Sequence, residues 1–486
     1  MVQAVLNFVK GKWVPSAGGQ TAARTNPADN KQTVSEFQLS TKEDVRSAIE
    51  AAKGAFEGWR AMPGPERGRL LYRAAEQMER ALDDFARTMT LEEGKTLIES
   101  TNETKRGIDI LRFFAGQASR SGGKTYRSGN PRTFVYSVRE PLGVVGLLTP
   151  WNFPLAIPCW KIAPALAAGN TVVFKPASLT PLNASKLVSA FERAGVPPGV
   201  LNFITGAGAK IGEELVTNDD VAAISFTGSY DVGNGVQRAR ANARKMARVQ
   251  LEMGGKNPTI VLPDAKMDAS VEVVTKAAFG LTGQACTATS RLIVHESVKE
   301  EFLKKLITRV KGIKVGDGLQ QGVEMGPAVD ESQLEKDLGY ISKGTEEGAK
   351  VITGGKQPKQ QEMADGNFIE PTIFDNVTTD MKIAQEEIFG PVLSVLTAKN
   401  FDDAIEMANN TVYGLSAGLC TTNLTSAFEF ADRVQAGVVL INRNTVGAET
   451  QIPFGGEKRS SSDTFREQGE EAIDFYTRVK TVYAIY

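Results

Sequence analysis

Cys286 is the first candidate for chemistry, and it lies in the run FGLTGQACTATSR, residues 279–291. Its neighbours are small or uncharged, which suits a tight turn where backbone meets a ligand and leaves the Cys286 N–H free to donate. In such a turn a thiolate stabilised by positive potential could act as a nucleophile. Alternatively, a lone cysteine fills an apolar core. The run alone leaves both interpretations open.

Glu252 is the candidate base, in the run VQLEMGGKNPTIV, residues 249–261. A carboxylate among apolar residues is partly desolvated, which raises its pKa and favours general-base catalysis. An ion pair between a strand-end Glu252 and Lys256 is the alternative.

Asn152 is flanked by Trp151 and Phe153 and bracketed by Pro150 and Pro154. The prolines stiffen the turn, and a side-chain amide fixed in an apolar loop is a good oxyanion donor. Alternatively, Asn152 caps its own turn.

Three further features favour a bound nucleotide. Lys175 directly follows the apolar run TVVF, where a cofactor's ribose or phosphate would lie, although it could equally be a solvated lysine. The runs TGAGAKIG and FTGSYDVG are glycine-rich turns that lead into predicted helices. Such turns offer N–H groups and a helix dipole to a phosphate. With the Cys/Glu/Asn set, they indicate covalent catalysis on a carbonyl carbon.

The chain must position these residues with α/β elements. Residues 41–118 carry apolar residues at helical spacing. Short apolar runs at 143–148, 171–174, 200–205 and 222–228 then alternate with predicted helices, which indicates a parallel sheet. In such sheets ligands bind beyond the carboxyl ends of the strands. A second alternating block follows Lys256, and residues 133–141 and 475–486 are predicted edge strands that could pair between subunits.

Composition excludes several classes of protein. The formal net charge of −1 over 486 residues makes nucleic acid and anionic membranes poor partners. The N-terminus lacks a signal-peptide pattern, and prolines interrupt the most apolar stretch, 142–174, so a membrane span is not expected. The single histidine, His295, excludes His-rich metal sites, so no metal is predicted. Three cysteines indicate a reducing cytoplasm rather than a disulfide framework.

The chain resembles the NAD(P)-dependent aldehyde dehydrogenase superfamily along nearly its whole length. The runs that carry this resemblance, in matching order and spacing, are PWNFP (150–154), FKPAS (174–178), FTGSYDVG (226–233), LEMGGKNP (251–258), GQACTATSR (283–291), EEIFGPV (386–392) and PFGGEK (453–458). Within the family it resembles the 2,5-dioxopentanoate (α-ketoglutarate semialdehyde) dehydrogenases, through runs such as WNFPLAIPCWKIAPALAAGN and FYTRVKTVY.

This resemblance implies roles for particular residues. Cys286 would be the nucleophile and Glu252 would activate the hydrolytic water, while Asn152 and the Cys286 N–H would form the oxyanion hole. The cofactor-binding residues it implies are Thr149, Pro150, Trp151, Lys175, Ser178, Gly208, Gly212, Phe226, Thr227, Gly228, Ser229, Val232, Gly254, Glu387 and Phe389. The substrate-binding residues it implies are Phe153, Trp160, Thr287, Arg443 and Phe454.

The resemblance also implies an α/β architecture with a Rossmann-like cofactor domain. That domain would take residues 1–122 and 142–254, the catalytic domain residues 255–455, and a small β oligomerisation arm residues 123–141 and 472–486. The implied state is a homodimer or homotetramer in the cytoplasm. The implied reaction is oxidation of an aldehyde to a carboxylic acid through a cysteine thioester. Broad-specificity, glyceraldehyde or succinate semialdehyde oxidation, CoA-dependent acylation and a non-catalytic role stay open as alternatives.

Four positions distinguish this chain from relatives. Ser178 replaces a glutamate that repels a 2′-phosphate in some relatives, so we expect NADP, with NAD possible. Serine and Asp463 replace glycines of the pattern PFGG-x-K-x-SG-x-G, so we expect a different backbone path between Lys458 and Arg466. Trp160 stands where succinate semialdehyde dehydrogenases commonly carry an arginine, which leaves Arg443 as the candidate partner for a substrate carboxylate.

Overall fold

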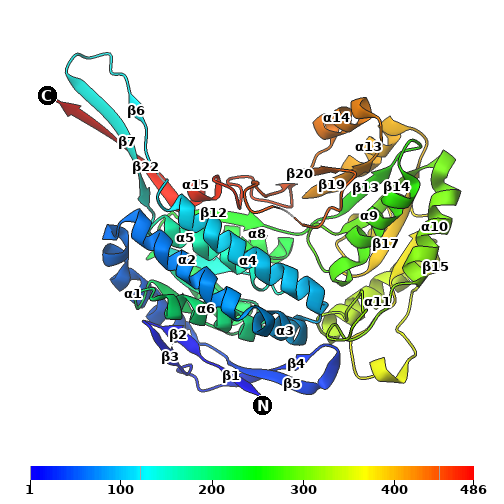
Figure 1. Cartoon of the computed structure of the whole chain (residues 1–486), viewed down its shortest axis with the longest axis horizontal. Coiled ribbons are helices and arrows are strands. Elements are labelled where there is room, and N and C mark those ends of the chain that lie inside the picture. Colours follow the sequence, from blue (N-terminus) through cyan, green and yellow to red (C-terminus); the bar gives the residue numbers. More distant parts are fainter. Residues whose placement is uncertain (1, 121, 448) are drawn as a thin grey trace.

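The computed structural model describes residues 2–120, 122–447 and 449–486. Met1, Ser121 and Ala448, which fall within the predicted domain ranges, lie outside the described residues. Two α/β halves face each other, and a β-ribbon arm projects from the first half beside the C-terminus (Figure 1). Mainly parallel sheets form the centre of both halves, so the predicted α/β fold class is confirmed.

Four helices fill the predicted helical region: α1 (Lys42–Ala61), α2 (Gly64–Arg80), α3 (Leu82–Glu93) and α4 (Leu97–Gln117). Thr41 caps α1 and Thr96 caps α4, each through a capping box with the acidic residue three positions on. The box at Thr96 fixes where α4 begins, and α4 is the helix that lines the site described below.

The first large sheet has seven strands in the order β12-β11-β8-β9-β10-β2-β3. Its parallel strands are β8 (Val144–Leu148), β9 (Thr171–Lys175), β10 (Leu201–Phe203), β11 (Val221–Thr227) and β12 (Arg248–Glu252); β2 (Asn7–Val9) and β3 (Lys12–Val14) form an antiparallel edge. Strand order reverses between β8 and β11, and ligands bind at such a switch point.

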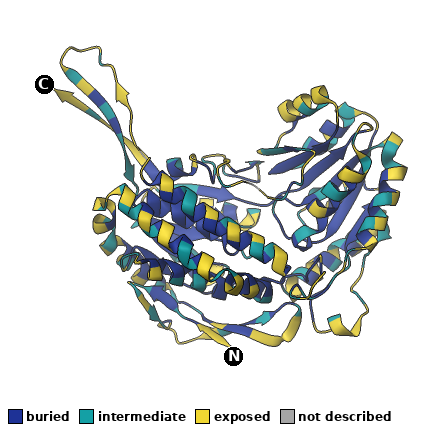
Figure 2. Cartoon of the chain, in the orientation of Figure 1, coloured by how far each residue is buried: buried dark blue, intermediate teal, exposed yellow. Residues whose placement is uncertain are grey.

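Helices cover both faces of this sheet. The helices that connect its strands are α5 (Ala156–Ala167), α6 (Pro181–Ala194), α7 (Gly208–Thr217) and α8 (Tyr230–Ala241). Helices α2, α4, α5 and α6 share one buried apolar cluster with the sheet, and α1, α7 and α8 share another. The strands are therefore buried on both sides, as their nearly continuous apolar sequences require (Figure 2).

The second large sheet has the order β15-β16-β17-β14-β13-β19-β20. Its strands are β13 (Asn257–Val261), β14 (Thr289–His295), β15 (Lys350–Thr353), β16 (Thr372–Asp375), β17 (Val392–Ala398), β19 (Ser416–Cys420) and β20 (Val438–Ile441). Its α-helices are α9 (Met267–Phe279), α10 (Lys299–Lys311), α11 (Glu331–Glu346), α12 (Lys382–Gln385), α13 (Phe401–Asn409) and α14 (Leu424–Arg433). His295 is the last residue of β14.

Smaller elements complete the fold. Short 3-10 turns are η1 (Gly280–Gly283), η2 (Glu296–Val298) and η3 (Gln361–Met363). Strands β1 (Gln3–Val5), β4 (Thr21–Asn26) and β5 (Asp29–Gln38) form a separate sheet, and β18 (Tyr413–Gly414) pairs with β21 (Glu457–Lys458). None of the helices within the described ranges is long and apolar enough to span a bilayer.

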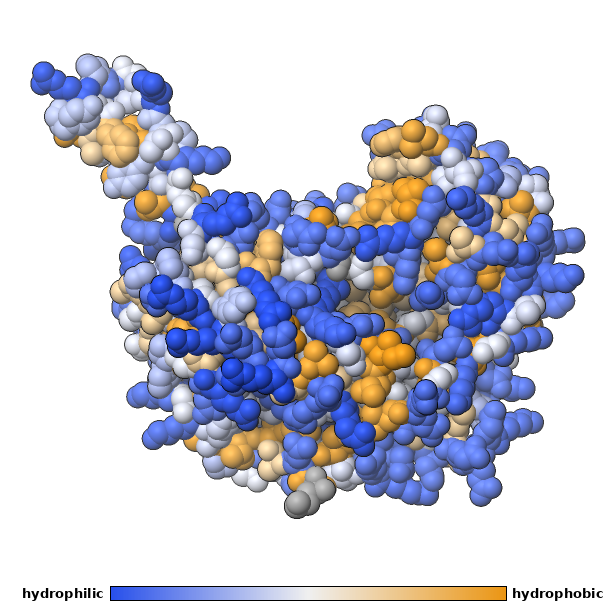
Figure 3. Space-filling model, viewed as in Figure 1, coloured by the Kyte–Doolittle hydropathy of each residue, from blue (hydrophilic) through white to orange (hydrophobic). Residues whose placement is uncertain are grey.

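The arm is an antiparallel ribbon of β6 (Thr125–Tyr126), β7 (Thr133–Pro141) and β22 (Thr477–Ile485), entered through α15 (Ala472–Tyr476). The two predicted edge strands therefore pair with each other within this chain, from Thr477 opposite Pro141 to Ile485 opposite Thr133. Tyr483 is 71% exposed and Ile485 84% exposed. Apolar side chains thus remain uncovered on the arm (Figure 3).

Candidate active site

Cys286 lies in the turn between η1 and β14, and its side chain is half-buried. The preceding backbone is left-handed at Leu281 (φ 54°), Thr282 (φ 57°) and Gly283 (φ 67°). A Cβ at Gly283 would stand 2.3 Å from the carbonyl oxygen of Gly390, so only glycine fits there. The Cys286 carbonyl accepts a hydrogen bond from Asn257 Nδ2 at 2.8 Å. The turn is therefore fixed from both sides, which fixes where the thiol lies.

Asn152 joins the first half of the molecule to this turn. Its side chain is 3% exposed, and Nδ2 donates to the carbonyl oxygen of Gln284 at 2.9 Å. The same amide has a second hydrogen, so it can also donate to an oxygen bound beside Cys286. The alternative in which Asn152 only caps its own turn does not fit this contact, since its partner is 132 residues away.

A buried ion cluster that sequence reasoning missed holds the Asn152 turn. Lys95 Nζ donates to the Asn152 carbonyl at 2.5 Å and to Glu103 at 2.7 Å. Glu103 also accepts the N–H groups of Leu155 and Ala156, at 2.9 and 3.0 Å. Burial alone would lower the pKa of Lys95, but the carboxylates of Glu103 and Glu93 outweigh it and raise the pKa. The only sequence signal is the charged run EEGK before α4, which resembles an ordinary solvated helix end.

Glu252 ends β12 and is 2% exposed. Its carboxylate accepts from the Ser461 hydroxyl at 2.8 Å and from the Gly456 N–H at 3.2 Å. Burial, and then the nearby Glu467 carboxylate, raise the pKa of Glu252 well above its usual range. Lys256 Nζ has no hydrogen-bond partner within the described part of the chain, so the predicted alternative of a Glu252–Lys256 ion pair is wrong.

Ser461 occupies one of the positions where the family pattern has glycine. Its backbone pairs with that of Glu252 as in an antiparallel strand. This pairing brings the Ser461 hydroxyl within hydrogen-bond distance of the Glu252 carboxylate. Asp463 occupies another such position and keeps the left-handed conformation, with φ 52°. Aspartate tolerates that region better than most residues. Beside this segment, Lys161 Nζ donates to Glu467 and to the Ser225 hydroxyl, so a second buried charge pair adjoins Glu252.

The carboxyl ends of the first sheet's strands offer unpaired polar groups to a ligand. Thr149 Oγ1 and Thr227 Oγ1, just after β8 and at the end of β11, are buried polar atoms without a hydrogen-bond partner in the described residues. Lys175 ends β9 and is 6% exposed, so it is not the solvated lysine that was the alternative. Burial lowers the pKa of Lys175 to about 8. These residues fit a polar, phosphate-bearing cofactor at the switch point of the sheet.

Glycines let this region approach a ligand closely. A Cβ at Gly254 would meet the Glu387 carboxylate at 2.1 Å, and the Gly255 N–H donates to that carboxylate at 2.9 Å. Gly208 begins α7, and a Cβ there would be 3.9 Å from Lys175 Nζ. Gly228 precedes the N-cap of α8, Ser229. The glycine-rich turns predicted at 205–212 and 226–233 therefore lie at the N-termini of α7 and α8, beside the carboxyl ends of the first sheet's strands.

The remaining predicted cofactor residues lie in the same region. Trp151 and Phe389 meet edge to face with ring centroids 5.4 Å apart, and both are half-buried. Ser178 donates to the Gly206 carbonyl at 2.9 Å. The others lie close by: Pro150 in the loop after β8, Phe226 near the end of β11, and Gly212 and Val232 within α7 and α8.

A hollow of about 720 Å³ runs beside the Asn152 turn, lined by α4, α9 and the loop at 443–447. Apolar surface gathers where the two halves meet (Figure 3). Phe153 lines the hollow, and the Phe454 ring lies tilted against the Trp160 ring with centroids 5.9 Å apart. Thr287 is 6% exposed beside Cys286. Arg443 lines the hollow as well, but its exposed side chain forms an ion pair with Glu449 at 3.0 Å.

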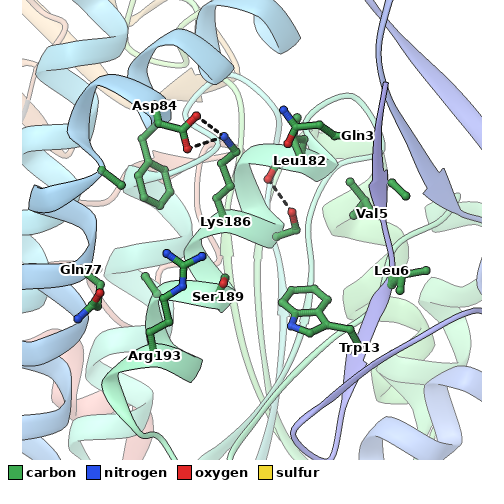
Figure 4. A pocket seen from close by; sticks show the side chains of 15 residues that line it. Gln3, Val5, Leu6, Trp13, Gln77, Asp84, Leu182, Lys186, Ser189 and Arg193 are labelled. Atoms are coloured by element: carbon green, nitrogen blue, oxygen red, sulfur yellow. Dashed lines mark hydrogen bonds and ion pairs between the residues drawn. The ribbon is translucent and has the colours of Figure 1, made fainter. Parts of the chain in front are cut away.

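A second groove, of about 490 Å³, lies between the N-terminal strands and α6 (Figure 4). It contains none of the predicted site residues. Its Lys186 is paired with Asp84 at 2.6 Å and with Thr88 at 2.8 Å, and Trp13 Nε1 donates to Glu192. Because this groove contains none of the predicted site residues, the hollow beside Asn152 is the candidate substrate site.

The chain belongs to the aldehyde dehydrogenase family, whose sequence pattern matches residues 13–482. It is 48% identical over 472 residues to the 2,5-dioxopentanoate dehydrogenase of Saccharolobus solfataricus, covering 97% of this chain and 98% of that protein. It is 48% identical over 478 residues to the alpha-ketoglutaric semialdehyde dehydrogenase of Bacillus subtilis, covering 98% of this chain and 97% of that protein.

Solved structures share the fold of this chain. The betaine aldehyde dehydrogenase of Staphylococcus aureus, crystallised with NAD+, matches with a TM-score of 0.96 at 36% identity, covering 99% of this chain and 94% of that chain. The family, the NAD(P)-dependent aldehyde dehydrogenase activity and the fold predicted from the motifs are therefore confirmed.

The thiol's surroundings predict a pH-dependent reactivity. Burial, with the Glu387 and Glu252 carboxylates, raises the pKa of Cys286 to about 12. Because the thiolate is the reactive form, its iodoacetamide alkylation should accelerate about tenfold per pH unit between pH 7 and 9. A cationic nicotinamide ring nearby favours the thiolate, so saturating NADP should accelerate labelling at pH 7. Mass-spectrometric labelling of Cys286 measures both effects.

Cys286→Ala is the control for this experiment, because it reports labelling at the buried thiols of Cys159 and Cys420. A rate independent of pH over this range, and unchanged by NADP, would contradict the prediction.

Proposed function

We propose that this protein oxidises 2,5-dioxopentanoate to 2-oxoglutarate, with Cys286 as nucleophile, Asn152 as oxyanion donor and Glu252 as general base. The observation that carries the proposal is the hydrogen bond from Asn152 Nδ2 to the Gln284 carbonyl at 2.9 Å. It brings an amide donor to the turn that holds the thiol. We assign the nucleophile to the second sheet unit, residues 255–455, and the cofactor to the first, residues 1–122 and 142–254.

The chain's residues then act in two stages. The Cys286 thiolate adds to the aldehyde carbon, and the resulting oxyanion accepts hydrogen bonds from Asn152 Nδ2 and the Cys286 N–H. A bound nicotinamide dinucleotide supplies the hydride acceptor that converts this adduct into a thioester. Glu252 removes a proton from water, whose oxygen attacks the thioester carbon and releases the acid and the Cys286 thiolate. The raised pKa of Glu252 suits it to accept that proton.

The substrate is assigned from the relatives named for 2,5-dioxopentanoate and alpha-ketoglutaric semialdehyde, both 48% identical to this chain. Glu252 favours hydrolysis of the thioester over transfer of the acyl group to CoA, since hydrolysis is the step that needs this base. Three free cysteines among the described residues support our assignment of the enzyme to a reducing cytoplasm.

The test separates the two stages by rapid mixing with 2,5-dioxopentanoate and NADP. Wild type should turn over continuously. Glu252→Gln should give a burst of NADPH close to one per active site, with steady-state turnover reduced about 100-fold or more, because only hydrolysis loses its base. Cys286→Ala should give no burst. Failure of the wild type to reduce NADP or NAD with this aldehyde, while it oxidises others, would refute the substrate assignment.

We propose that the cofactor is NADP, with NAD also accepted. Ser178 is a small, half-buried side chain whose hydroxyl donates to the Gly206 carbonyl, and Lys175 lies close to the same strand end. Ser178→Glu places a carboxylate beside the 2′-phosphate, and such a like-charge contact costs more than about 1.4 kcal/mol. The kcat/KM ratio of NADP to NAD should therefore fall about tenfold or more. A strong preference of the wild type for NAD would overturn this proposal.

We propose that the arm, residues 123–141 and 472–486, joins subunits into a homodimer or homotetramer. Its support is the exposed apolar side chains of β22, which no other part of the described chain covers. The double variant Tyr483→Lys, Ile485→Lys should reduce the oligomer to a smaller species in light scattering, since it charges the contact without touching the subunit's core. Met246→Lys, at a fully exposed site outside the arm, is the control. An unchanged mass for the double variant would contradict the proposal.

A further inference from the structure

Unpaired N–H donors gather around Arg106 of helix α4. Arg106 Nε, Trp160 Nε1 and Gln468 Nε2 are buried, and none has a hydrogen-bond acceptor in the described part of the chain. They are neighbours: the Arg106 guanidinium lies 5.3 Å from the Trp160 ring, and Arg106 Nη2 donates to Gln468 Oε1 at 2.9 Å. Three different elements therefore direct buried donors to one place.

This arrangement is costly without a ligand. A buried donor without an acceptor forfeits its hydrogen bonds to water, and a buried guanidinium does so with a full charge. Burial lowers the pKa of Arg106, and the Glu103 and Cys286 side chains oppose that shift. The guanidinium therefore interacts favourably with the thiolate form of Cys286. A group with several acceptor oxygens and a negative charge would satisfy this cluster.

The hollow's other charged side chains are either paired or exposed. Glu103 accepts from Lys95 at 2.7 Å, and Glu99 accepts from the Leu281 N–H at 2.7 Å. Arg309 pairs with Glu324 at 2.6 Å and with Glu272 at 2.9 Å. Among the residues the structure describes, Arg106 is therefore the partly buried cation of this hollow whose buried Nε has no acceptor and can donate to a ligand.

We propose that Arg106, together with Trp160 and Gln468, binds the carboxylate and adjoining 2-oxo group of the substrate while its aldehyde carbon meets Cys286. This inference rests on the proposed function and names the residues that select its substrate. A 2-oxo acid presents three acceptor oxygens in one plane, and a guanidinium recognises a carboxylate through paired N–H groups.

Arg106 is better placed for this role than Arg443, the candidate from sequence. Arg443 is exposed, and its guanidinium already donates to Glu449 and to the Gly447 carbonyl. A substrate carboxylate there would compete with an existing ion pair in water, where such contacts contribute little. Arg106 also lies over Trp160, the position at which the sequence lacks the arginine of succinate semialdehyde dehydrogenases. Helix α4 thus supplies a guanidinium at a point where α5 carries Trp160 rather than a charged side chain.

The test compares 2,5-dioxopentanoate with pentanal, which has the same chain length and no acid. In Arg106→Met, KM for 2,5-dioxopentanoate should rise about 10- to 100-fold, the loss expected for a hydrogen-bonded charge. Kinetic constants for pentanal should change little, which also shows that the variant folds. Arg106→Lys should recover part of the loss, because it restores the charge without the paired geometry.

Arg112→Met is the matched control. Arg112 lies on the same helix, 5.8 Å from the Tyr72 ring, and pairs with Glu79 outside the hollow. It should leave both substrates unaffected. Equal losses for both aldehydes in Arg106→Met would show a structural role and overturn the inference, as would a selective loss in Arg443→Met with none in Arg106→Met. If wild type oxidises pentanal but not 2,5-dioxopentanoate, the proposed function fails instead.

A binding measurement supports the kinetics without turnover. The acid 2-oxopentanoate matches the substrate except that a methyl group replaces the aldehyde. It should slow alkylation of Cys286 by iodoacetamide in wild type and in Arg112→Met, with a half-protecting concentration about 10-fold or more higher in Arg106→Met. Identical protection in wild type and Arg106→Met would refute the inference.

Discussion

The hydrogen bond from Asn152 Nδ2 to the Gln284 carbonyl is the contact on which the site depends, because its partners come from opposite halves of the molecule. Asn152 follows β8 at the switch point of the first sheet, and Gln284 precedes the thiol on the second. A carbonyl and an amide that are both buried must be paired. The bond therefore holds the two halves in a relative position that brings the amide, the thiol and the hollow together.

A buried charge cluster within the first half of the molecule fixes the Asn152 turn. Lys95 binds the Asn152 carbonyl and Glu103, and Glu103 holds the first turn of α5. Removing one member of such a cluster leaves an uncompensated buried charge, which is strongly destabilising. The rigid support also explains why Phe153 can serve as a fixed wall: its ring lies 4.8 Å from Lys95 Nζ.

Two buried carboxylates next to each other set the chemistry of the base. Glu467 raises the pKa of Glu252, while Lys161 and Ser461 oppose that shift. Ser461, which replaces a glycine of the family pattern, thus donates a hydrogen bond directly to the Glu252 carboxylate. The same segment carries Gln468, whose Oε1 accepts a hydrogen bond from Arg106, so the segment contacts both the base and the proposed carboxylate-binding cluster.

The sequence by itself determined the α/β class and the element order, because apolar periodicity and glycine-rich turns are local signals. It also offered Cys286, Glu252 and Asn152 as candidates, whose proposed roles rest on the motifs shared with the family. It could not reveal the Lys95 cluster or the Arg106 donors. EEGK reads as a solvated helix end, and Arg106 as a polar position on an exposed helix face. It also pointed to Arg443, whose loop position gave no sign of its pairing with Glu449. Only the tertiary structure decided these, because burial and partners depend on residues brought together from distant parts of the chain.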